Sequence, residues 1–454
     1  MAKQLLAVDI GAGSGRIIRG CFENNRLSLR EEARFSNPLL TDADGYTYWD
    51  FEHLSKNVLE YLKSAAEADS IGFDSFSPDF GIFDSEGRLC HHMLSYHNYF
   101  QESLPARVLE SYSEEALHDM CGNPPSPLGI LARLCWLQDR YEYAANPGNT
   151  LLPLANALAF SLCGERFTDF SYSFDCGIGN LEGKWNENLT RFLKAGSDIL
   201  PKVLPFGETV GYFKQTSGKK LAVINTALHD TASAYYALRL LSDGQLCMNA
   251  GTWFSVGVPA QRPILTPQSK QLGVENIALP DESFIHGHTF PGAWFLQTFR
   301  KEIGGIPFGI MSMEARNEKG AFISADVSDM SRYQGSAGLI TTIRKDMENC
   351  GITNPGDYQV LRSIYEGLAN AVAQAITQIE TISHKKFTKI FMSGGVTQDS
   401  FLCSLIEEKT QTKIVPCMKE ASVVGNLIQQ LQGQKLVGSL EECQMLMKTP
   451  EEKE

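Results

Sequence analysis

The chain has 454 residues, of which 43% are hydrophobic and 20% charged, and its formal net charge is −13. This length exceeds what one hydrophobic core supports, so we expect two or three domains. An acidic surface repels phosphate backbones and anionic lipid, which argues against nucleic acid or a membrane as the partner.

The cysteines and the N-terminus indicate the cellular compartment. The eleven cysteines are scattered, and none forms a CxxC pair or a His/Cys cluster with zinc spacing. Cys135, Cys163 and Cys247 lie in apolar runs, as expected for reduced thiols that pack as small hydrophobes. The start, MAKQLLAVDIGAG, lacks the apolar segment of a signal peptide, and no run approaches about 18 apolar residues. We therefore expect a cytoplasmic protein without a spanning helix.

The first 80 residues alternate short β-type runs with turn signals. LLAVDI, GRIIRGCF and RLSLREEARF predict three antiparallel strands, joined by GAGSG and ENN. Residues 52–68 carry apolar side chains at helical spacing and predict a helix. SIGFDSF then predicts a buried strand, and FGIFDSEGRL predicts a strand with a turn. This alternation of strands and helices indicates the α/β class.

A similar pattern begins near residue 244, about half a chain length later. DGQLCMNAGTWFSVGVPAQ predicts a strand, a turn of small residues and a second strand. The repeat suggests a duplicated scaffold of two related α/β domains, with a boundary near residue 240. Residues 358–382 form the clearest helical pattern, and KKFTKIFMSGGV predicts a strand that ends in glycines. The tail after residue 446 is expected to fray.

Asp9 and the glycines after it form the first candidate site, DIGAGSGR at residues 9–16. Glycine lets backbone N–H groups approach phosphate oxygens because no Cβ intervenes, and Asp9 could hold Mg²⁺ directly or through water. The alternative is a glycine-rich hairpin with an aspartate in its turn. The pattern is neither a Rossmann fingerprint, since no helix is expected after the glycines, nor a Walker loop, since no Lys-Ser/Thr follows.

Four later motifs also have both a functional and a structural interpretation. Asp79, in SFSPDF, could accept hydrogen bonds from hydroxyl groups or be a solvated turn residue. Asp230, in HDTASA, could be a general base in phosphoryl transfer or the N-cap of a helix. The glycines of AGTW (250–253) and SGGVTQD (393–399) could face a nucleotide or form tight turns. For each motif taken alone, both interpretations stay open.

Taken in this order, the motifs resemble the FGGY family of carbohydrate kinases, and within it the rhamnulokinase-like branch. GYTYWD, PGAWFLQ and KEASVVGN add to the resemblance, which runs from about residue 5 to residue 432. HDTASA followed by GTW is its most specific part. The resemblance implies an α/β fold of two actin/hexokinase-type (ribonuclease H-like) domains that flank a cleft. Residues 1–240 would bind mainly the sugar, and residues 241–454 mainly ATP.

The resemblance also implies a reaction, ligands and site residues. The ATP γ-phosphate would pass to a hydroxyl of a ketose, such as L-rhamnulose, L-fuculose or a pentulose, with Mg²⁺ as the metal. The resemblance also implies a possible homodimer. The residues assigned in this way are Asp230 as the catalytic base; Asp79, Pro78, His229, Thr231 and Thr289 at the sugar; Gly13, Ser14, Arg16, Gly251, Thr252, Gln297, Gly394, Gly395 and Asp399 at the nucleotide; and Asp9 at the metal.

The sugar side departs from the family pattern. Relatives carry Trp-Gly-Val-Asp where this chain has Phe76-Ser77-Pro78-Asp79, and Tyr-Arg-Asp where it has Tyr96-His97-Asn98. Thr289 replaces an asparagine, and Val396 replaces a third glycine. The sequence therefore predicts ATP-dependent sugar phosphorylation more firmly than any particular sugar.

Two alternatives to a sugar kinase remain on the sequence alone. One is a nucleotide-binding regulator or degenerate kinase on the same fold, suggested by the altered sugar-side residues. The other is a hydrolase that uses His229, which the absence of a GxSxG elbow disfavours.

Overall fold

Two six-stranded mixed sheets organise the computed structural model, which describes residues 2–98, 103–194, 199–333 and 335–447. The first sheet has the order β12-β13-β6-β1-β2-β3 and the second the order β16-β17-β15-β14-β18-β19. Their strands are β1 (Lys3–Ile10), β2 (Ser14–Glu23), β3 (Arg26–Ser36), β6 (Ser70–Ser75), β12 (Thr209–Lys214), β13 (Lys220–Ile224), β14 (Leu246–Ala250), β15 (Trp253–Ala260), β16 (Glu275–Ala278), β17 (Phe284–Pro291), β18 (Lys389–Ser393) and β19 (Lys413–Pro416).

The two sheets repeat one connectivity, which confirms the predicted duplication. In the first, β1, β2 and β3 form an antiparallel meander, and β6 and then β13 add parallel to β1. In the second, β14, β15 and β17 form the meander, and β18 and then β19 add parallel to β14. Edge strands β12 and β16 extend this common core. The fold is the expected pair of actin/hexokinase-type domains.

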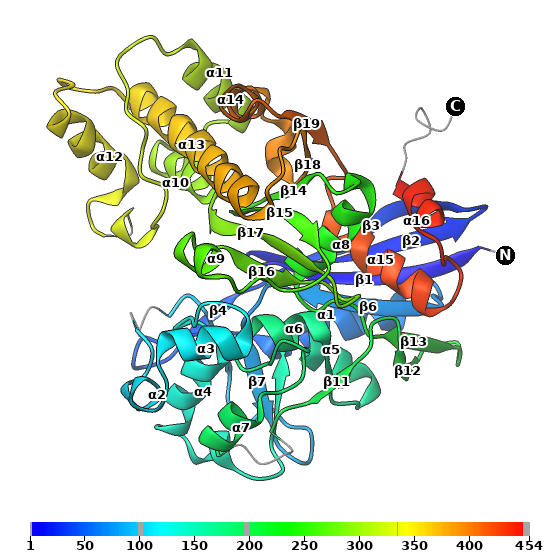
Figure 1. Ribbon diagram of the computed structural model, residues 1–454. Helices are drawn as coiled ribbons and strands as arrows, with labels where there is room; N and C mark the ends of the chain where they lie inside the picture. The colour runs from blue at the N-terminus through cyan, green and yellow to red at the C-terminus, as the bar shows by residue number, and fades with distance from the viewer. Residues whose placement is uncertain (1, 99–102, 195–198, 334, 448–454) are drawn as a thin grey trace.

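Smaller elements complete the two halves (Figure 1). The remaining strands are β4 (Leu39–Thr41), β5 (Thr47–Trp49), β7 (Phe80–Phe83), β8 (Met93–Leu94), β9 (Thr150–Pro153), β10 (Phe167–Asp169) and β11 (Lys202–Leu204). The helices are α1 (Phe51–Ser64), α2 (Ala106–Ser111), α3 (Glu114–Cys121), α4 (Ile130–Gln138), α5 (Leu154–Cys163), α6 (Phe170–Asp175), α7 (Glu187–Phe192), α8 (Asp230–Ser242), α9 (Pro267–Gln271), α10 (Trp294–Glu302), α11 (Phe308–Asn317), α12 (Gly338–Asn349), α13 (Asp357–Ser383), α14 (Ser400–Thr410), α15 (Ala421–Gly433) and α16 (Leu440–Met447).

Two predicted helices are present with slightly different bounds. The helix expected at 358–382 is α13, which covers the second sheet. The helix expected at 52–68 is α1, which starts after the N-cap Asp50 and ends at Ser64. It is shorter than predicted because Ala65 already has extended backbone angles, φ −69° and ψ 153°. Apart from Met447, the tail expected to fray lies outside the described residues.

Helices α8 and α15 join the two halves (Figure 1). α8 leads from the first half into β14 and packs on the second sheet, whereas α15 returns from β19 and packs on β1 and β6 of the first sheet. Their apolar contact includes Tyr236 and Ala237 on α8 and Val424 and Leu427 on α15. The predicted boundary near 240 falls inside α8. Because α15 packs on the first sheet, the last segment of the chain also contributes to the first half.

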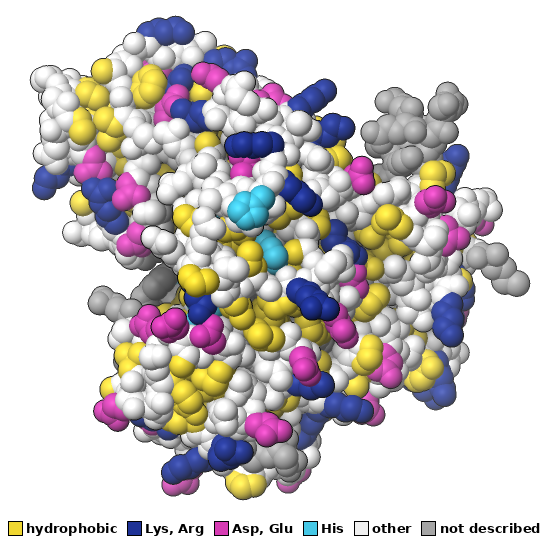
Figure 2. Space-filling view, viewed as in Figure 1, with side chains coloured by type: hydrophobic (Ala, Val, Ile, Leu, Met, Phe, Trp, Pro, Cys, Tyr) yellow, Lys and Arg dark blue, Asp and Glu magenta, His cyan; other side chains and the backbone are white. Residues whose placement is uncertain are grey.

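The described residues include no helix long and apolar enough to cross a membrane. On the face drawn in Figure 2, acidic and basic side chains are interspersed, so the net charge of −13 does not gather there into one acidic field. Cys135 and Cys247 are buried free thiols, as expected, and burial raises their pKa values to about 11 and about 12.

Candidate active site

Two buried carboxylates lie at the ends of neighbouring strands in the first sheet. Asp9 on β1 and Asp74 on β6 are register partners, with 4% and 0% of their surface exposed. Burial raises the pKa of Asp9, and the charge of Asp230 adds to this effect while Arg16 opposes it. Burial and then the charge of Asp9 hold the pKa of Asp74 well above its ordinary value. Carboxylates in such a pair favour either a shared proton or a nearby cation.

Arg16 on β2 supplies one cation to this pair. Its guanidinium pairs with Asp9 and with Glu420, the residue before α15. Ser422 donates its hydroxyl to Asp9 at 3.3 Å. Five residues earlier, Cys417 donates its N–H to Met392 of β18. Since five residues span at most about 18 Å, this short segment limits how far apart the carboxyl ends of β1 and β18 can lie.

The glycine-rich turn between β1 and β2 is open to solvent beside Asp9. The Gly11 N–H donates to the Ser14 carbonyl at 3.0 Å, which closes the turn. Gly13 is exposed, and a Cβ built there would meet no atom within 4 Å. Ser14 accepts a hydrogen bond from Arg34 at 3.4 Å. The turn therefore offers accessible backbone at the edge of the carboxylate pair.

Asp230 is the first residue of α8, and its carboxylate does not cap the helix. His229 occupies the N-cap position, and no side chain makes the capping hydrogen bond. The Asp230 side chain is 32% exposed, and its Oδ1 accepts the Thr231 hydroxyl at 3.1 Å. The carboxylate thus lies at the N-terminus of α8, where the helix carries partial positive charge. The simple N-cap interpretation of Asp230 is therefore wrong.

His229 lies between two carboxylates. Its Nε2 is 3.7 Å from Asp230 Oδ1, and its Nδ1 is 3.5 Å from Oδ2 of Asp175, the last residue of α6. Burial by itself would lower the pKa of His229, but the contact with Asp175 and the charges of Asp230 and Asp169 outweigh burial and raise it. Protonation of His229 is therefore favoured at this point of the site.

Asp79 does not face the open part of the site, contrary to the prediction. Its side chain is fully buried, and it accepts hydrogen bonds from the Trp49 indole, the Arg133 guanidinium and the Tyr96 N–H. Three protein donors therefore occupy the two oxygens, and the carboxylate anchors the surrounding loops. The neighbouring carbonyl of Pro78 accepts the Tyr172 hydroxyl at 3.3 Å.

The altered sugar-side residues form an aromatic group. Phe76 packs on Trp49 with ring centroids 4.7 Å apart, and the exposed His97 stacks on Tyr96 at 4.2 Å. Asn98 instead forms hydrogen bonds with the backbone of Thr47. Its Oδ1 accepts the Thr47 N–H and its Nδ2 donates to the Thr47 carbonyl, each at 2.7 Å. This part of the site thus carries aromatic surface.

Thr289 is exposed on β17 and belongs to a polar row in the second half. Its hydroxyl is 3.1 Å from the Ser255 hydroxyl, which accepts a hydrogen bond from Tyr235 of α8 at 2.9 Å. Glu275 on β16 adjoins Thr289. Burial raises the pKa of Glu275 to about 7, with a further contribution from the charge of Asp175, while hydrogen bonding to Thr289 opposes the rise.

The glycine turns of the second sheet lie side by side. A Cβ at Gly394 would come within 2.4 Å of the carbonyl oxygen of Ala250, so the turn after β18 touches the turn after β14. Gly395 and Thr252 are exposed, and a Cβ at Gly251 would meet only the Trp253 carbonyl oxygen, at 3.7 Å. Gln297 on α10 is 3.5 Å from the Thr252 hydroxyl. The predicted nucleotide residues of this half therefore meet at one edge, with one exception.

The exception is Asp399, which is a structural residue. Its Oδ1 accepts the Ser312 hydroxyl at 2.6 Å and caps α14 through the N–H groups of Phe401 and Leu402. Its Oδ2 accepts the Tyr365 hydroxyl at 2.6 Å. The carboxylate thereby ties α11, α13 and α14 together through both of its oxygens.

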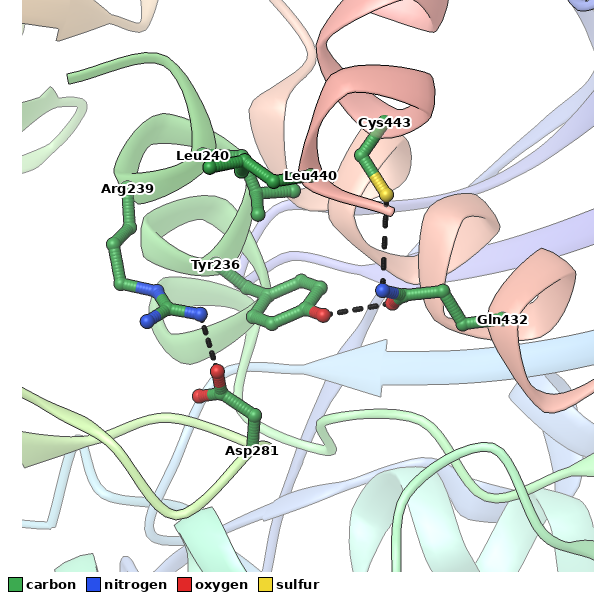
Figure 3. A pocket seen from close by; sticks show the side chains of 7 residues that line it. All are labelled: Tyr236, Arg239, Leu240, Asp281, Gln432, Leu440 and Cys443. Atoms are coloured by element: carbon green, nitrogen blue, oxygen red, sulfur yellow. Dashed lines mark hydrogen bonds and ion pairs between the residues drawn. The ribbon is translucent and has the colours of Figure 1, made fainter. Parts of the chain in front are cut away.

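A cavity of about 340 Å³ lies elsewhere, between α8 and α16 (Figure 3). Its polar side chains face one another: Arg239 pairs with Asp281, and Tyr236 donates to Gln432 at 2.7 Å. Arg239 is nine residues beyond Asp230, which corresponds to about 13 Å along the helix. This cavity is therefore separate from the carboxylate cluster.

Sequence reasoning missed four residues that the structure brings to the site: Asp74, Asp175, Glu275 and Asn426, whose amide on α15 donates to Asp74 at 2.6 Å. Asp74 could have been recognised, because its strand SIGFD was predicted and the carboxyl ends of parallel strands meet at one edge of a sheet. The other three come from α6, an edge strand and α15, and no local pattern connects them with Asp230.

The sequence matches the models of both halves of the FGGY family of carbohydrate kinases, the N-terminal domain over residues 4–236 and the C-terminal domain over residues 246–432. The chain belongs to this family. It is a sugar phosphotransferase of the rhamnulokinase-like type, and this membership speaks against the hydrolase alternative.

Curated relatives and solved structures agree with this assignment. A rhamnulokinase of Oceanobacillus iheyensis is 26% identical, covering 98% of this chain and 96% of the relative. One from Pectobacterium atrosepticum is 27% identical, covering 94% and 87%. Among solved structures, a xylulose kinase from Lactobacillus acidophilus has a TM-score of 0.79 at 15% identity, covering 98% and 92%. A Plasmodium falciparum glycerol kinase with ADP has a TM-score of 0.80 at 12% identity, covering 98% and 93%. These two structural matches support the fold.

Proposed function

We propose that this protein phosphorylates a ketose with ATP and that Asp230 is the general base. One observation carries the proposal. Asp230 is a solvent-accessible carboxylate at a helix N-terminus, and its charge reaches both Asp9 and Asp74. An accessible carboxylate beside a buried pair meets the needs of proton removal and of charge stabilisation in phosphoryl transfer.

In the proposed reaction, Asp230 accepts the proton of the attacking sugar hydroxyl. The hydroxyl oxygen bonds to the γ-phosphorus, the bond from that phosphorus to the β–γ bridging oxygen breaks, and ADP leaves. Phosphoryl transfer depends mainly on positioning and charge stabilisation, so the fixed place of Asp230 on α8 matters as much as its basicity. Exclusion of water as a competing acceptor would require closure of the two halves around the substrates.

We assign Mg²⁺ to Asp9 and Asp74, held directly or through water. Oδ1 of Asp74 is buried without a hydrogen-bond partner among the described residues, and Arg16 is a neighbouring cation of the pair. The described residues include no group of three or more His, Cys, Asp and Glu side chains suited to a metal. Two carboxylates suit Mg²⁺, which usually completes its shell with waters and substrate phosphates. When bound, Mg²⁺ supplies charge neutralisation to the phosphoryl oxygens.

We assign the nucleotide to the open glycine turns of both sheets. Gly13, Ser14 and Arg16 would contact phosphate oxygens from the first half. From the second half, Gly251, Thr252 and Gln297 would do the same, and Gly394 and Gly395 would receive the adenosine. Bare backbone at strand ends allows close approach of a ligand. In this scheme, residues 241–454 bind mainly ATP, although α15 reaches back to the first half.

We assign the sugar to the region around His229, Thr231, Thr289 and the Pro78 loop. The names of the curated relatives make L-rhamnulose the first candidate, and other 6-deoxy ketoses and pentuloses follow. The aromatic surface of Phe76 and Tyr96 suits an apolar edge of a sugar better than a charged group. Buried free thiols such as Cys135 fit a reducing compartment, and we propose the cytoplasm.

The test is an ATP-consumption assay with L-rhamnulose, L-fuculose, L-ribulose, D-ribulose, D-xylulose and glycerol, with the Asp230→Asn variant as matched control. We expect turnover with at least one ketose. Asp230→Asn should keep its fold and lose about 10² to 10⁴ in kcat, the usual contribution of a general base. Near-normal turnover of Asp230→Asn would remove the base assignment. Failure of every sugar while ATP still binds would favour a nucleotide-binding regulator.

A further inference from the structure

Asp175 is a buried carboxylate that the proposed reaction does not use. It ends α6 in the first half, its side chain is 13% exposed, and its two oxygens face different partners. Oδ2 lies 3.5 Å from His229 Nδ1, and Oδ1 accepts the N–H of Ala278 on β16 at 3.4 Å. His229 Nδ1 and Asp175 Oδ2 are both buried with no hydrogen-bond partner among the described residues, so each is the polar atom that faces the other.

We propose that Asp175 is a positioning residue for the reaction. One of its oxygens holds the Nδ1 side of His229, which directs Nε2 toward Asp230, and the other engages the backbone of the second half at Ala278. This proposal rests on the proposed function, because it assumes that Asp230 is the base. It goes beyond that function in giving a role to a third residue, which contacts neither the base nor the nucleotide turns.

Each nitrogen of the imidazole faces a carboxylate. An imidazole ring can present only one defined edge to a substrate when its other nitrogen is held by a partner. Here Asp175 holds Nδ1, and Nε2 is left 3.7 Å from Asp230 Oδ1. The backbone is fixed as well, since Leu228 donates its N–H to Asp169 at 3.4 Å and accepts the Ser75 N–H at 2.8 Å. With the neighbouring backbone held, the rotation of the imidazole ring is the remaining freedom, and Asp175 sets its orientation.

The charges around His229 explain why a carboxylate is needed here. Asp175 faces it from the end of α6, Asp169 from the end of β10, and Asp230 from the start of α8. Glu275, on β16, faces Asp175 in turn. Burial lowers the pKa of His229, and these carboxylates outweigh burial to favour the imidazolium. In its protonated form His229 carries an N–H on both nitrogens, one facing Asp175 and the other facing Asp230.

The contact with Ala278 links this arrangement to the second half. β16 also contacts the first half through Asn276, whose N–H donates to Asn123 at 2.7 Å, while the Asn123 amide donates to the Asn276 carbonyl at 2.9 Å. Phe174 on α6 packs against Phe284 on β17, with centroids 5.0 Å apart. Asp175 thus contacts both His229 in the first half and the backbone of β16 in the second half.

The test combines kinetics with the titration of His229. In Asp175→Asn we expect the sugar KM to rise about tenfold, the scale of one lost charge-assisted hydrogen bond, and kcat to fall less than about threefold. The pH limb of kcat/KM that belongs to His229 should move to lower pH. The double variant Asp175→Asn/His229→Gln should be no worse than His229→Gln alone, since Asp175 acts through the ring. Independent effects that multiply would overturn the proposal.

Two further measurements make each outcome decisive. Asp119→Asn is the matched control: Asp119 on α3 pairs with Lys270 on α9, so it also joins the two halves, but it lies away from His229. It should leave the pH limb unmoved.

NMR titration of His229, assigned with His229→Gln, should show a lower pKa in Asp175→Asn. This readout needs no turnover, so an inactive wild-type protein would contradict the proposed function alone. An unchanged His229 titration, or loss of the fold in Asp175→Asn, would contradict the positioning role.

Discussion

The side-chain amide of Asn426 donates to Oδ2 of Asp74 at 2.6 Å. Asn426 lies on α15, near the end of the chain, whereas Asp74 lies on β6 of the first sheet. One turn before Asn426, Ser422 reaches Asp9, and one turn after it Gln430 donates to the Leu6 carbonyl at 2.9 Å. One polar face of α15 therefore supports both carboxylates to which we assign Mg²⁺, and it couples the two halves at that point.

Asn426→Ala should weaken the carboxylate pair. The change leaves Asp74 without its donor, and a buried acceptor without a partner costs about 1 to 3 kcal/mol. The pKa of Asp74, already well above its ordinary value, should rise further because the amide lowers it. We expect a lower melting temperature without Mg²⁺ and a higher Mg²⁺ concentration for half-maximal turnover. Differential scanning fluorimetry and an activity titration with MgCl₂ measure the two effects.

The control for Asn426 is on the same helix. Gln432→Ala removes the acceptor of the Tyr236 hydroxyl on another face of α15, away from the carboxylates. It should cost stability without changing the Mg²⁺ requirement. Equal Mg²⁺ dependence in both variants would show that the polar face of α15 acts on stability alone.

Gly394 and Gly395 should separate folding from nucleotide binding. Gly394 has φ 94° and ψ 173°, a region open to glycine alone, and a Cβ there would lie 2.4 Å from the Ala250 carbonyl oxygen. Gly394→Ala should therefore lose about 3 kcal/mol or more of stability. A Cβ at Gly395 meets nothing within 4 Å, so Gly395→Ala should change stability by less than about 0.5 kcal/mol.

The KM for ATP tests whether Gly395 contacts the nucleotide. If adenosine lies against Gly395, the added methyl group should raise the KM for ATP several-fold while the KM for the sugar stays constant. Chemical denaturation and initial-rate kinetics provide the two measurements. An unchanged ATP KM in Gly395→Ala would place the nucleotide elsewhere.

Local patterns in the sequence predicted the elements that carry the fold. Alternation in LLAVDI and GRIIRGCF predicted β1 and β2, and helical spacing predicted α13, because these patterns depend on neighbouring residues alone. The repeat near residue 244 predicted the second sheet. The position of α15 on the first sheet could not be predicted in this way, since its partners on β1 and β6 lie hundreds of residues earlier in the chain.

The sequence predicted the site residues that lie at the ends of strands and helices. It did not predict which side chains would donate hydrogen bonds to them. Asp230 and the glycine turns lie at element boundaries, which the sequence marks. Asp79 and Asp399 looked similar in sequence, yet Arg133 and Tyr365 occupy their oxygens. A residue type shows that a carboxylate is present, but only the fold shows which donors surround it.

Glu275 should make stability depend on pH. Its pKa is raised from 4.5 to about 7, chiefly by burial. Between these values the folded protein retains a proton that the unfolded chain has lost, so stability should fall as the pH rises from about 4.5 to about 7. The full shift corresponds to about 3 kcal/mol, an upper bound because the side chain keeps some solvent contact.

Glu275→Gln should remove this dependence, because glutamine keeps the shape without the charge. Urea denaturation at pH 5 and pH 8 should give a smaller difference for the variant than for the wild type. Glu182, which is exposed and pairs with Lys184, offers a control whose substitution by glutamine leaves the slope unchanged. A wild-type slope retained in Glu275→Gln would assign the pH dependence to another group.

Asp79→Asn should destabilise the protein more than it impairs sugar binding. The carboxylate is buried with Arg133, and removing one partner of a buried ion pair typically costs about 3 to 5 kcal/mol. Glu60→Gln, which affects the exposed pair with Lys56, should cost no more than about 1 kcal/mol. At a temperature where Asp79→Asn remains folded, its sugar KM should stay within about threefold of the wild type, because the buried carboxylate makes no direct contact with sugar. A large KM increase in a fully stable variant would restore Asp79 as a sugar contact.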